Sequence, residues 1–119
     1  MRCMALLTCV TMMAALRAGA ESVRPNDFPT VERVLFVEAC VRDHPDRART
    51  EMLYKCSCAL DSIAAELSYA EYVDASTAFA AGQVAGERGT AIRESSTGQD
   101  LAGRYREARA NARKRCMLP

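Results

Sequence analysis

The segment TEMLYKCSCALDSIAAEL, residues 50–67, carries the strongest periodic pattern in this chain. Its large apolar residues recur at steps of three and four, which is the spacing of one buried face of an α-helix. These residues are Leu53, Cys56, Leu60, Ile63 and Leu67. We expect a helix that starts between Asp46 and Thr50, ends at Leu67 and packs through this face.

A helix is expected before this one, because Asp27 can cap a helix that carries Pro29 in its first turn, where a missing amide costs little. It should run to about Asp43, since Pro45 pushes the residue before it out of helical geometry. Its inward residues are predicted to be Val34, Phe36, Val37, Cys40 and Val41.

A third helix is predicted after Leu67, where Ser68 and Glu71 have the spacing of a capping box. Leu67 and Tyr72 stand where a hydrophobic staple belongs. The residues expected to face inward on this helix are Tyr69, Tyr72, Val73, Ser76, Phe79 and Ala80.

The pattern then breaks at Gly82, Gly86 and Gly89, so we expect residues 86–96 to form a loop. Ser96–Gln99 should cap a last helix. Its apolar face is predicted to be Leu101, Tyr105, Ala108, Ala112 and Cys116, and its arginines should point toward water. No alternating strand pattern is present. The sequence therefore predicts an all-α, four-helix domain.

The first twenty residues are typical of an export signal. Met1-Arg2 supplies a positive start, Cys3–Leu16 is almost entirely apolar, and Ala18–Ala20 offers a small-x-small cleavage pattern. We expect a signal peptide (1–20), a flexible leader (21–26) and a helical domain (27–119). A lipidated Cys9 is the less favoured alternative. The protein should then be periplasmic or secreted, with no stable membrane anchor.

Four cysteines remain after cleavage, namely Cys40, Cys56, Cys58 and Cys116. In an oxidising compartment they are expected to form two disulfides, and three pairings are possible. Residues two apart on a helix are rotated by about 200°, so Cys56 and Cys58 should point to opposite sides. This geometry slightly favours Cys40–Cys56 and Cys58–Cys116.

The Cys-Ser-Cys segment also allows a soft-metal (copper) carrier or a thiol-redox protein, which would require residues 55–59 to be non-helical or Cys58 to be free. Metal binding is disfavoured because His44 is the one histidine and Met52 is the nearest soft co-ligand. His44 is interpreted as a helix-end residue near the carbonyl dipole. No catalytic constellation is visible, and we expect no enzyme activity, no cofactor and no metal.

Charge is distributed unevenly along the chain. Residues 61–100 hold seven acids and two bases, whereas residues 104–115 hold six bases and one acid. Such a dipolar surface can orient a protein partner, and nucleic acid is not expected. The candidate partner-binding residues are Glu87 and Arg88 in the predicted loop, and Arg104, Arg109 and Arg113 in the last helix.

Three segments carry a resemblance to a known group: residues 55–61 (KCSCALD), 72–77 (YVDAST) and 86–89 (GERG). The chain resembles, over about residues 36–116, small exported bacterial proteins of unknown activity associated with PQQ-dependent (quinoprotein) alcohol oxidation systems. The resemblance implies a periplasmic accessory to a dehydrogenase or its cytochrome, and it carries no site residue. The leading hypothesis is therefore a non-catalytic interaction or accessory protein, with a small hydrophobic-ligand carrier as a further alternative.

Overall fold

The computed structural model of the protein describes residues 26–119, which form five α-helices and, within that range, no β-strand. The helices are α1 (Thr30–Arg42), α2 (Arg49–Glu66), α3 (Tyr69–Gly82), α4 (Glu87–Glu94) and α5 (Ser96–Arg115). The predicted all-α fold class is confirmed. The predicted signal peptide (1–20), and the predicted leader (21–26) apart from Asn26, lie outside the described residues.

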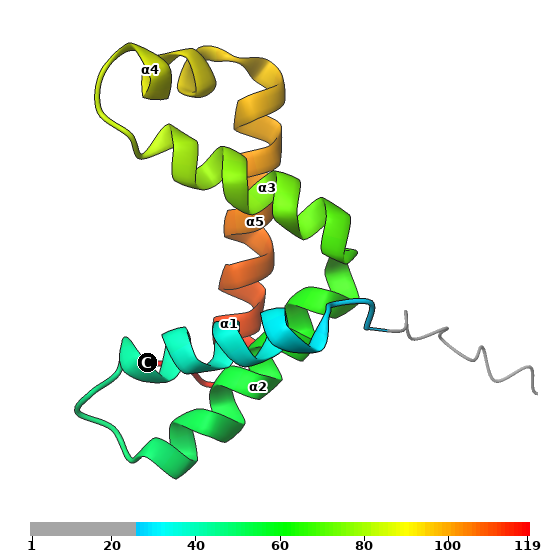
Figure 1. The fold of residues 1–119 in the computed structure, drawn as a ribbon, viewed down its shortest axis with the longest axis vertical. Helices are drawn as coiled ribbons and strands as arrows, with labels where there is room; N and C mark the ends of the chain where they lie inside the picture. The colour runs from blue at the N-terminus through cyan, green and yellow to red at the C-terminus, as the bar shows by residue number, and fades with distance from the viewer. Residues whose placement is uncertain (1–25) are drawn as a thin grey trace, which may run out of the picture.

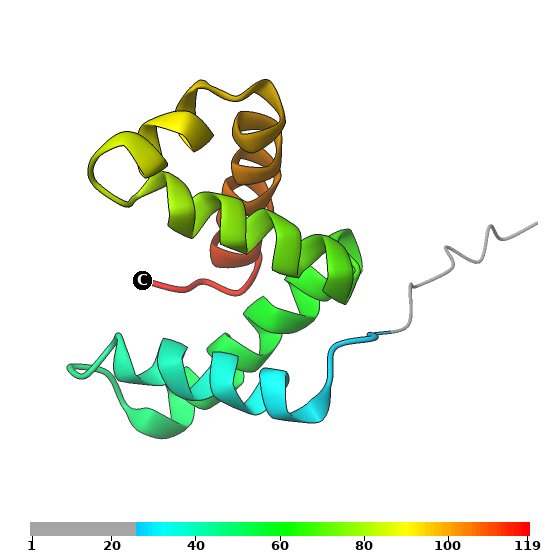
Figure 2. The ribbon, with the colours of Figure 1, turned by 45° about the horizontal axis from the view of Figure 1, so that its top comes forward.

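The helices form two layers (Figure 1). A hairpin of α1 and α2 makes one layer, and α3, α4 and α5 make the other, with the most extensive helix contact between α3 and α5. The long α5 reaches from the α4 end of the molecule to the α1–α2 hairpin. Figure 2 shows that the segment after α5 lies between the two layers.

The face of α2 is buried as its periodicity predicts, and it supplies the centre of the core. Cys56, Leu60, Ile63 and Leu67 are buried, while Leu53 is half-buried. The main core cluster adds small residues of α5 and one aromatic ring from before α1; its buried members are Phe28, Ala59, Leu60, Ile63, Ala64, Leu67, Ala108, Ala112 and Cys116. The core is built around α2.

The start of α1 differs from the prediction, because Asp27 does not cap this helix. The N-cap residue is Pro29, which has no side-chain capping bond. Asp27 Oδ1 instead accepts a hydrogen bond of 2.9 Å from the backbone N–H of Tyr69, the first residue of α3. The segment before α1 therefore crosses the start of α3, and this crossing buries Phe28.

One residue of α1 that was expected inward is exposed. Val34 retains 51% of its accessible surface, because α1 packs chiefly on α2 and only one of its faces is covered. Val37 and Cys40 are half-buried and Val41 is buried, as predicted for that face.

The predicted capping box of α3 is present. The Ser68 N–H donates to Glu71 Oε2 at 2.8 Å, and the Glu71 N–H donates to Ser68 Oγ at 3.3 Å. Leu67 and Tyr72 pack into the same core cluster, as a hydrophobic staple requires. The entry of the chain into α3 is therefore encoded locally.

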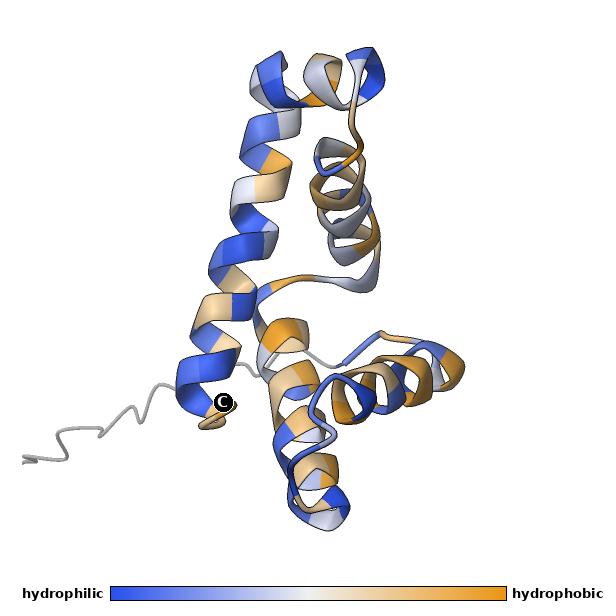
Figure 3. Cartoon of the chain, turned by 90° about the vertical axis from the view of Figure 1, so that its left-hand side faces the viewer, coloured by the Kyte–Doolittle hydropathy of each residue, from blue (hydrophilic) through white to orange (hydrophobic). Residues whose placement is uncertain are grey.

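The inward face of α3 is partly different from the prediction. Val73 and Ala80 are exposed, and the buried residues are Ala75 and Ala78. α5 buries alanines at Ala102, Ala108 and Ala112. These small residues lie in the two helices that make the most extensive contact of the fold. Figure 3 shows the mostly hydrophilic α5, with apolar residues at intervals.

The loop predicted at residues 86–96 is wrong, because α4 occupies Glu87–Glu94. Gly86 begins this helix at φ +86°, a conformation that favours glycine. Gly89 serves close packing, since a Cβ there would lie 1.8 Å from the Val84 carbonyl oxygen. Arg93 then closes the corner by donating to the carbonyls of Gly82 (2.7 Å) and Val84 (3.2 Å).

The cap of α5 is one residue earlier than predicted. Ser95, and not Ser96, is the N-cap, and its Oγ accepts a 3.1 Å hydrogen bond from the Gly98 N–H. At the other end, Met117 takes φ 51° and the Leu118 N–H donates to the Arg113 carbonyl at 3.0 Å, the pattern of a Schellman motif. This turn directs Leu118 back onto the core.

Two glycine substitutions should separate close packing from helix propensity. We expect Gly89→Ala to lower the free energy of unfolding by more than about 1 kcal/mol, because its Cβ would collide with backbone. Gly103→Ala is the matched control, since the nearest atom to its added Cβ, Arg106 Nη2, is 4.0 Å away. This change within α5 should raise stability by up to about 1 kcal/mol. Chemical denaturation of both variants checks the prediction, and an unchanged or stabilised Gly89→Ala protein would contradict it.

Candidate functional site

The four described cysteines form two disulfides, which join Cys40 to Cys56 and Cys58 to Cys116. This is the pairing that the helix geometry favours. Cys56 is fully buried and faces α1, whereas Cys58 is exposed and reaches Cys116 at the end of α5. Because each sulfur is bonded to a different helix, Cys56 and Cys58 cannot act together as thiolate ligands in this state.

His44 lies at the end of α1, as the sequence indicates. Its Nδ1 is 2.8 Å from the carbonyl oxygen of Cys40, so the proton at Nδ1 donates to this carbonyl. Met52 is fully buried against Val41 and Cys56. Among residues 26–119 there is no group of three or more His, Cys, Asp or Glu side chains placed to hold a metal ion.

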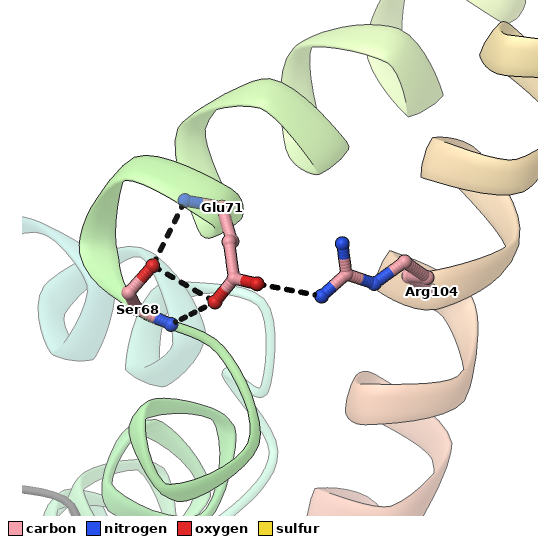
Figure 4. Close-up of polar contacts among 3 residues, drawn as sticks. All are labelled: Ser68, Glu71 and Arg104. Atoms are coloured by element: carbon pink, nitrogen blue, oxygen red, sulfur yellow. Dashed lines mark hydrogen bonds and ion pairs between the residues drawn. The ribbon is translucent and has the colours of Figure 1, made fainter.

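The five candidate partner-binding residues do not form one surface. Arg104 pairs with Glu71 Oε1 at 2.9 Å and thereby ties α5 to the capping box of α3 (Figure 4). Glu87 and Arg88 are exposed on α4, far from the α1–α2 hairpin (Figure 1). Arg109 and Arg113 lie instead beside a cleft between the two layers.

This cleft has a volume of about 540 Å³ and is the main candidate for a functional site. It is lined by residues of all four of the long helices and of the segment after α5, and it is open to solvent on one side. Its apolar lining consists of Phe36, Ala39, Cys40, Ala59, Ile63, Ala112 and Leu118. Its polar lining consists of Asp43, His44, Tyr72, Tyr105, Arg109 and Arg113. A site of this kind can hold a molecule with an apolar body and a polar group.

Two rings that line the cleft, those of Tyr72 and Tyr105, belong to a longer chain of packed aromatic rings. Phe28 packs on Tyr69 and Tyr72 with centroid distances of 5.3 and 5.0 Å. Tyr72 lies 5.8 Å from Tyr105, which lies 5.2 Å from Phe79. The chain of rings joins the segment before α1 to α3 and α5. Tyr72 and Tyr105 are therefore held in place by packing against neighbouring rings that do not themselves line the cleft.

Tyr72 has a strongly perturbed acidity. Burial, followed by the charge and hydrogen bonding of Tyr105, raises the pKa of Tyr72 to about 12. The guanidinium of Arg109 acts in the opposite direction but is a smaller influence. The Tyr72 hydroxyl therefore stays neutral at physiological pH.

The cleft is not evident from the sequence, because the aromatic residues that line it occupy expected core positions. Phe36 and Tyr72 stand on the faces of their helices that are expected to be buried, and Leu118 belongs to no expected helix face. One signal was present: Tyr105, Arg109 and Arg113 follow one another at steps of four, which places them on the same face of α5. The Arg109 guanidinium indeed lies 5.5 Å from the centre of the Tyr105 ring.

Comparisons of the chain with protein-family models, with curated proteins and with solved structures found no match. Over the described part of the chain, none of the helices has the length and apolar character needed to cross a membrane.

Removal of either disulfide should destabilise the protein strongly. The bonds close loops with sequence separations of 16 and 58 residues, and loop entropy predicts that each contributes about 3–4 kcal/mol. We expect Cys40→Ala/Cys56→Ala and Cys58→Ala/Cys116→Ala to lose about that much stability in urea denaturation. Arg115→Ala, an exposed neighbour of Cys116, is the control and should change stability by less than about 0.5 kcal/mol. If the two variants, each lacking one of the disulfides, were as stable as the wild type, the prediction would be contradicted.

Tyr72 should ionise late in an alkaline titration of the folded protein. Its folded-state pKa of about 12 lies above the ordinary value of 10.0. The neutral form is therefore favoured by folding, and this contribution to stability is present below pH 10 and is lost as the pH rises through about 12. Ultraviolet absorbance of tyrosinate should show a late component that Tyr72→Phe removes. If Tyr72→Phe instead removed a tyrosinate component that ionises near the ordinary pKa of 10.0, the raised pKa would not belong to Tyr72.

Proposed function

We propose that this protein is a non-catalytic binding protein of the periplasm or the extracellular space, and that it holds a small amphipathic organic molecule in the cleft between its layers. The observation that carries this proposal is the cleft itself. Its 540 Å³ falls within the roughly 300–1,000 Å³ that are usual for small-molecule sites. Its lining combines aromatic and aliphatic walls with a few arginine and tyrosine side chains, as such sites commonly do.

The two disulfides support the location. Structural disulfides persist in oxidising compartments, and the small, alanine-rich core of this domain needs such cross-links. The export signal expected at residues 1–20 points to the same compartment. The periplasm is the more specific proposal, because it is the location implied by the resemblance to exported bacterial proteins.

The cysteines are better suited to structure than to metal or redox chemistry. The two bonds join α2 to two different parts of the fold: Cys40–Cys56 attaches α1, and Cys58–Cys116 attaches the end of α5. Exchange at this bond would release one side of the cleft, so a working thiol-redox cycle would disturb the fold. This reasoning places the soft-metal and redox alternatives behind the binding of an organic ligand.

A second candidate function is an accessory protein that docks on a protein partner through α4. Glu87 and Arg88 are exposed there, and neither makes a hydrogen bond or ion pair within residues 26–119. They stand on a corner that Arg93 holds rigidly to the carbonyls of Gly82 and Val84. The resemblance to proteins of quinoprotein alcohol oxidation systems suggests a dehydrogenase or its cytochrome as that partner.

Filling the cleft should abolish ligand binding. Ala39 lies in the cleft on α1 and is half-buried, so Ala39→Trp places an indole ring in the space that the ligand would occupy. We expect the neutral fluorescent probe N-phenyl-1-naphthylamine to bind the wild type saturably and to bind Ala39→Trp at least about tenfold more weakly, the loss of roughly 1.4 kcal/mol of binding free energy.

Ala110→Trp is the matched control, because Ala110 is exposed on α5 outside the cleft. It should bind the probe as the wild type does. Circular dichroism on all three proteins checks that they are folded. Absence of saturable binding to the wild type, or equal binding to Ala39→Trp, would reject the cleft as a binding site.

A further inference from the structure

The polar groups of the cleft are biased toward positive charge. Of the charged side chains that line it, Arg109 and Arg113 of α5 are positive, and Asp43, which follows α1, is negative. Charges around a partly enclosed cavity attract ligands of the opposite sign and hold them more strongly than an open surface does. The cleft is therefore better suited to a negatively charged ligand than to a cation.

Arg109 is the arginine of α5 whose hydrogen-bonding groups remain available at the cleft. Arg104 is paired with Glu71, and Arg113 donates to the carbonyl oxygen of Pro119. Arg109 rests over the Tyr105 ring, and within residues 26–119 it makes no hydrogen bond or ion pair. A guanidinium stacked in this way is oriented by the ring while its N–H donors stay free, and their planar arrangement matches a carboxylate.

The walls near Arg109 suit a flat apolar body. Phe36 comes from the α1–α2 layer, and Tyr72 and Tyr105 come from the opposite layer, so rings line both sides of the space. The two tyrosines also offer hydroxyl groups, and that of Tyr72 stays neutral and can donate to an anion without repelling it. Aromatic side chains favour stacked or edge-on contacts with another ring.

We infer that the ligand of the cleft is an aromatic monocarboxylic acid, whose ring lies between Phe36 and Tyr72 and whose carboxylate binds Arg109. This inference rests on the proposed function and adds the chemical class of the ligand. A small inorganic anion would leave the aromatic walls unused. A neutral aromatic compound would leave the donors of the exposed Arg109 to water and gain nothing from its charge.

Two probes of similar size test the inference: 2-naphthoate, which carries a carboxylate, and 2-naphthalenemethanol, which is neutral. Isothermal titration calorimetry should show that the wild type binds naphthoate at least about tenfold more tightly than the alcohol, because the carboxylate accepts charge-assisted hydrogen bonds from Arg109. Arg109→Gln should remove that preference while binding of the neutral alcohol stays within about twofold. Arg109→Lys keeps the charge and should retain part of the preference for naphthoate.

Arg106→Gln is the matched control, because Arg106 lies on the same helix outside the cleft and its loss changes the net charge equally. It should leave both affinities unchanged. Equal affinities of the wild type for the two probes would overturn the inference and leave the proposed function standing. Equal losses in Arg109→Gln and Arg106→Gln would overturn the assignment to Arg109. Failure of both probes to bind the wild type would overturn the proposed function as well.

Discussion

Two sulfur atoms that leave α2 on opposite sides hold the layers of this protein together. Cys56 bonds to Cys40 on α1, and Cys58 bonds to Cys116 at the end of α5. α1 has little other support, because it packs chiefly on α2, and the segment after α5 follows directly from Cys116. Both sides of the cleft are thus attached covalently to one helix. A small domain can keep such a cavity because its walls do not depend on a large core alone.

Small residues decide how the second layer packs, and they also shape the cleft. α3 buries Ala75 and Ala78, and it makes the most extensive helix contact of the fold with α5. Aromatic rings also pack across these two helices, since Tyr105 of α5 lies against Tyr72 and Phe79 of α3. Of these rings, Tyr72 and Tyr105 line the cleft. The same packing that stabilises the layer therefore supplies the aromatic wall of the candidate site.

The arginines of α5 illustrate how tertiary contacts divide similar side chains among different roles. Arg104 forms an ion pair with α3, and Arg113 donates a hydrogen bond to the segment after α5. Arg109 stacks on an aromatic ring at the cleft. These residues lie within three turns of one helix and have the same intrinsic chemistry. Their partners differ because each faces a different neighbour. An excess of basic residues in a helix therefore does not by itself define a binding surface.

Local sequence patterns are enough to predict the helical class, the course of α2, the capping box at Ser68 and the opposite directions of Cys56 and Cys58. These features follow from helix periodicity and from bonds between residues three or four apart, which are local properties of the backbone. Three other features depend on tertiary contacts: Asp27 contacts the start of α3, Gly89 packs within a short helix and not a loop, and a cleft opens beside Arg109. Each of these depends on which atoms of another segment come close. For Asp27 and for the walls of the cleft, those partners lie tens of residues away along the chain, beyond the reach of a periodic pattern.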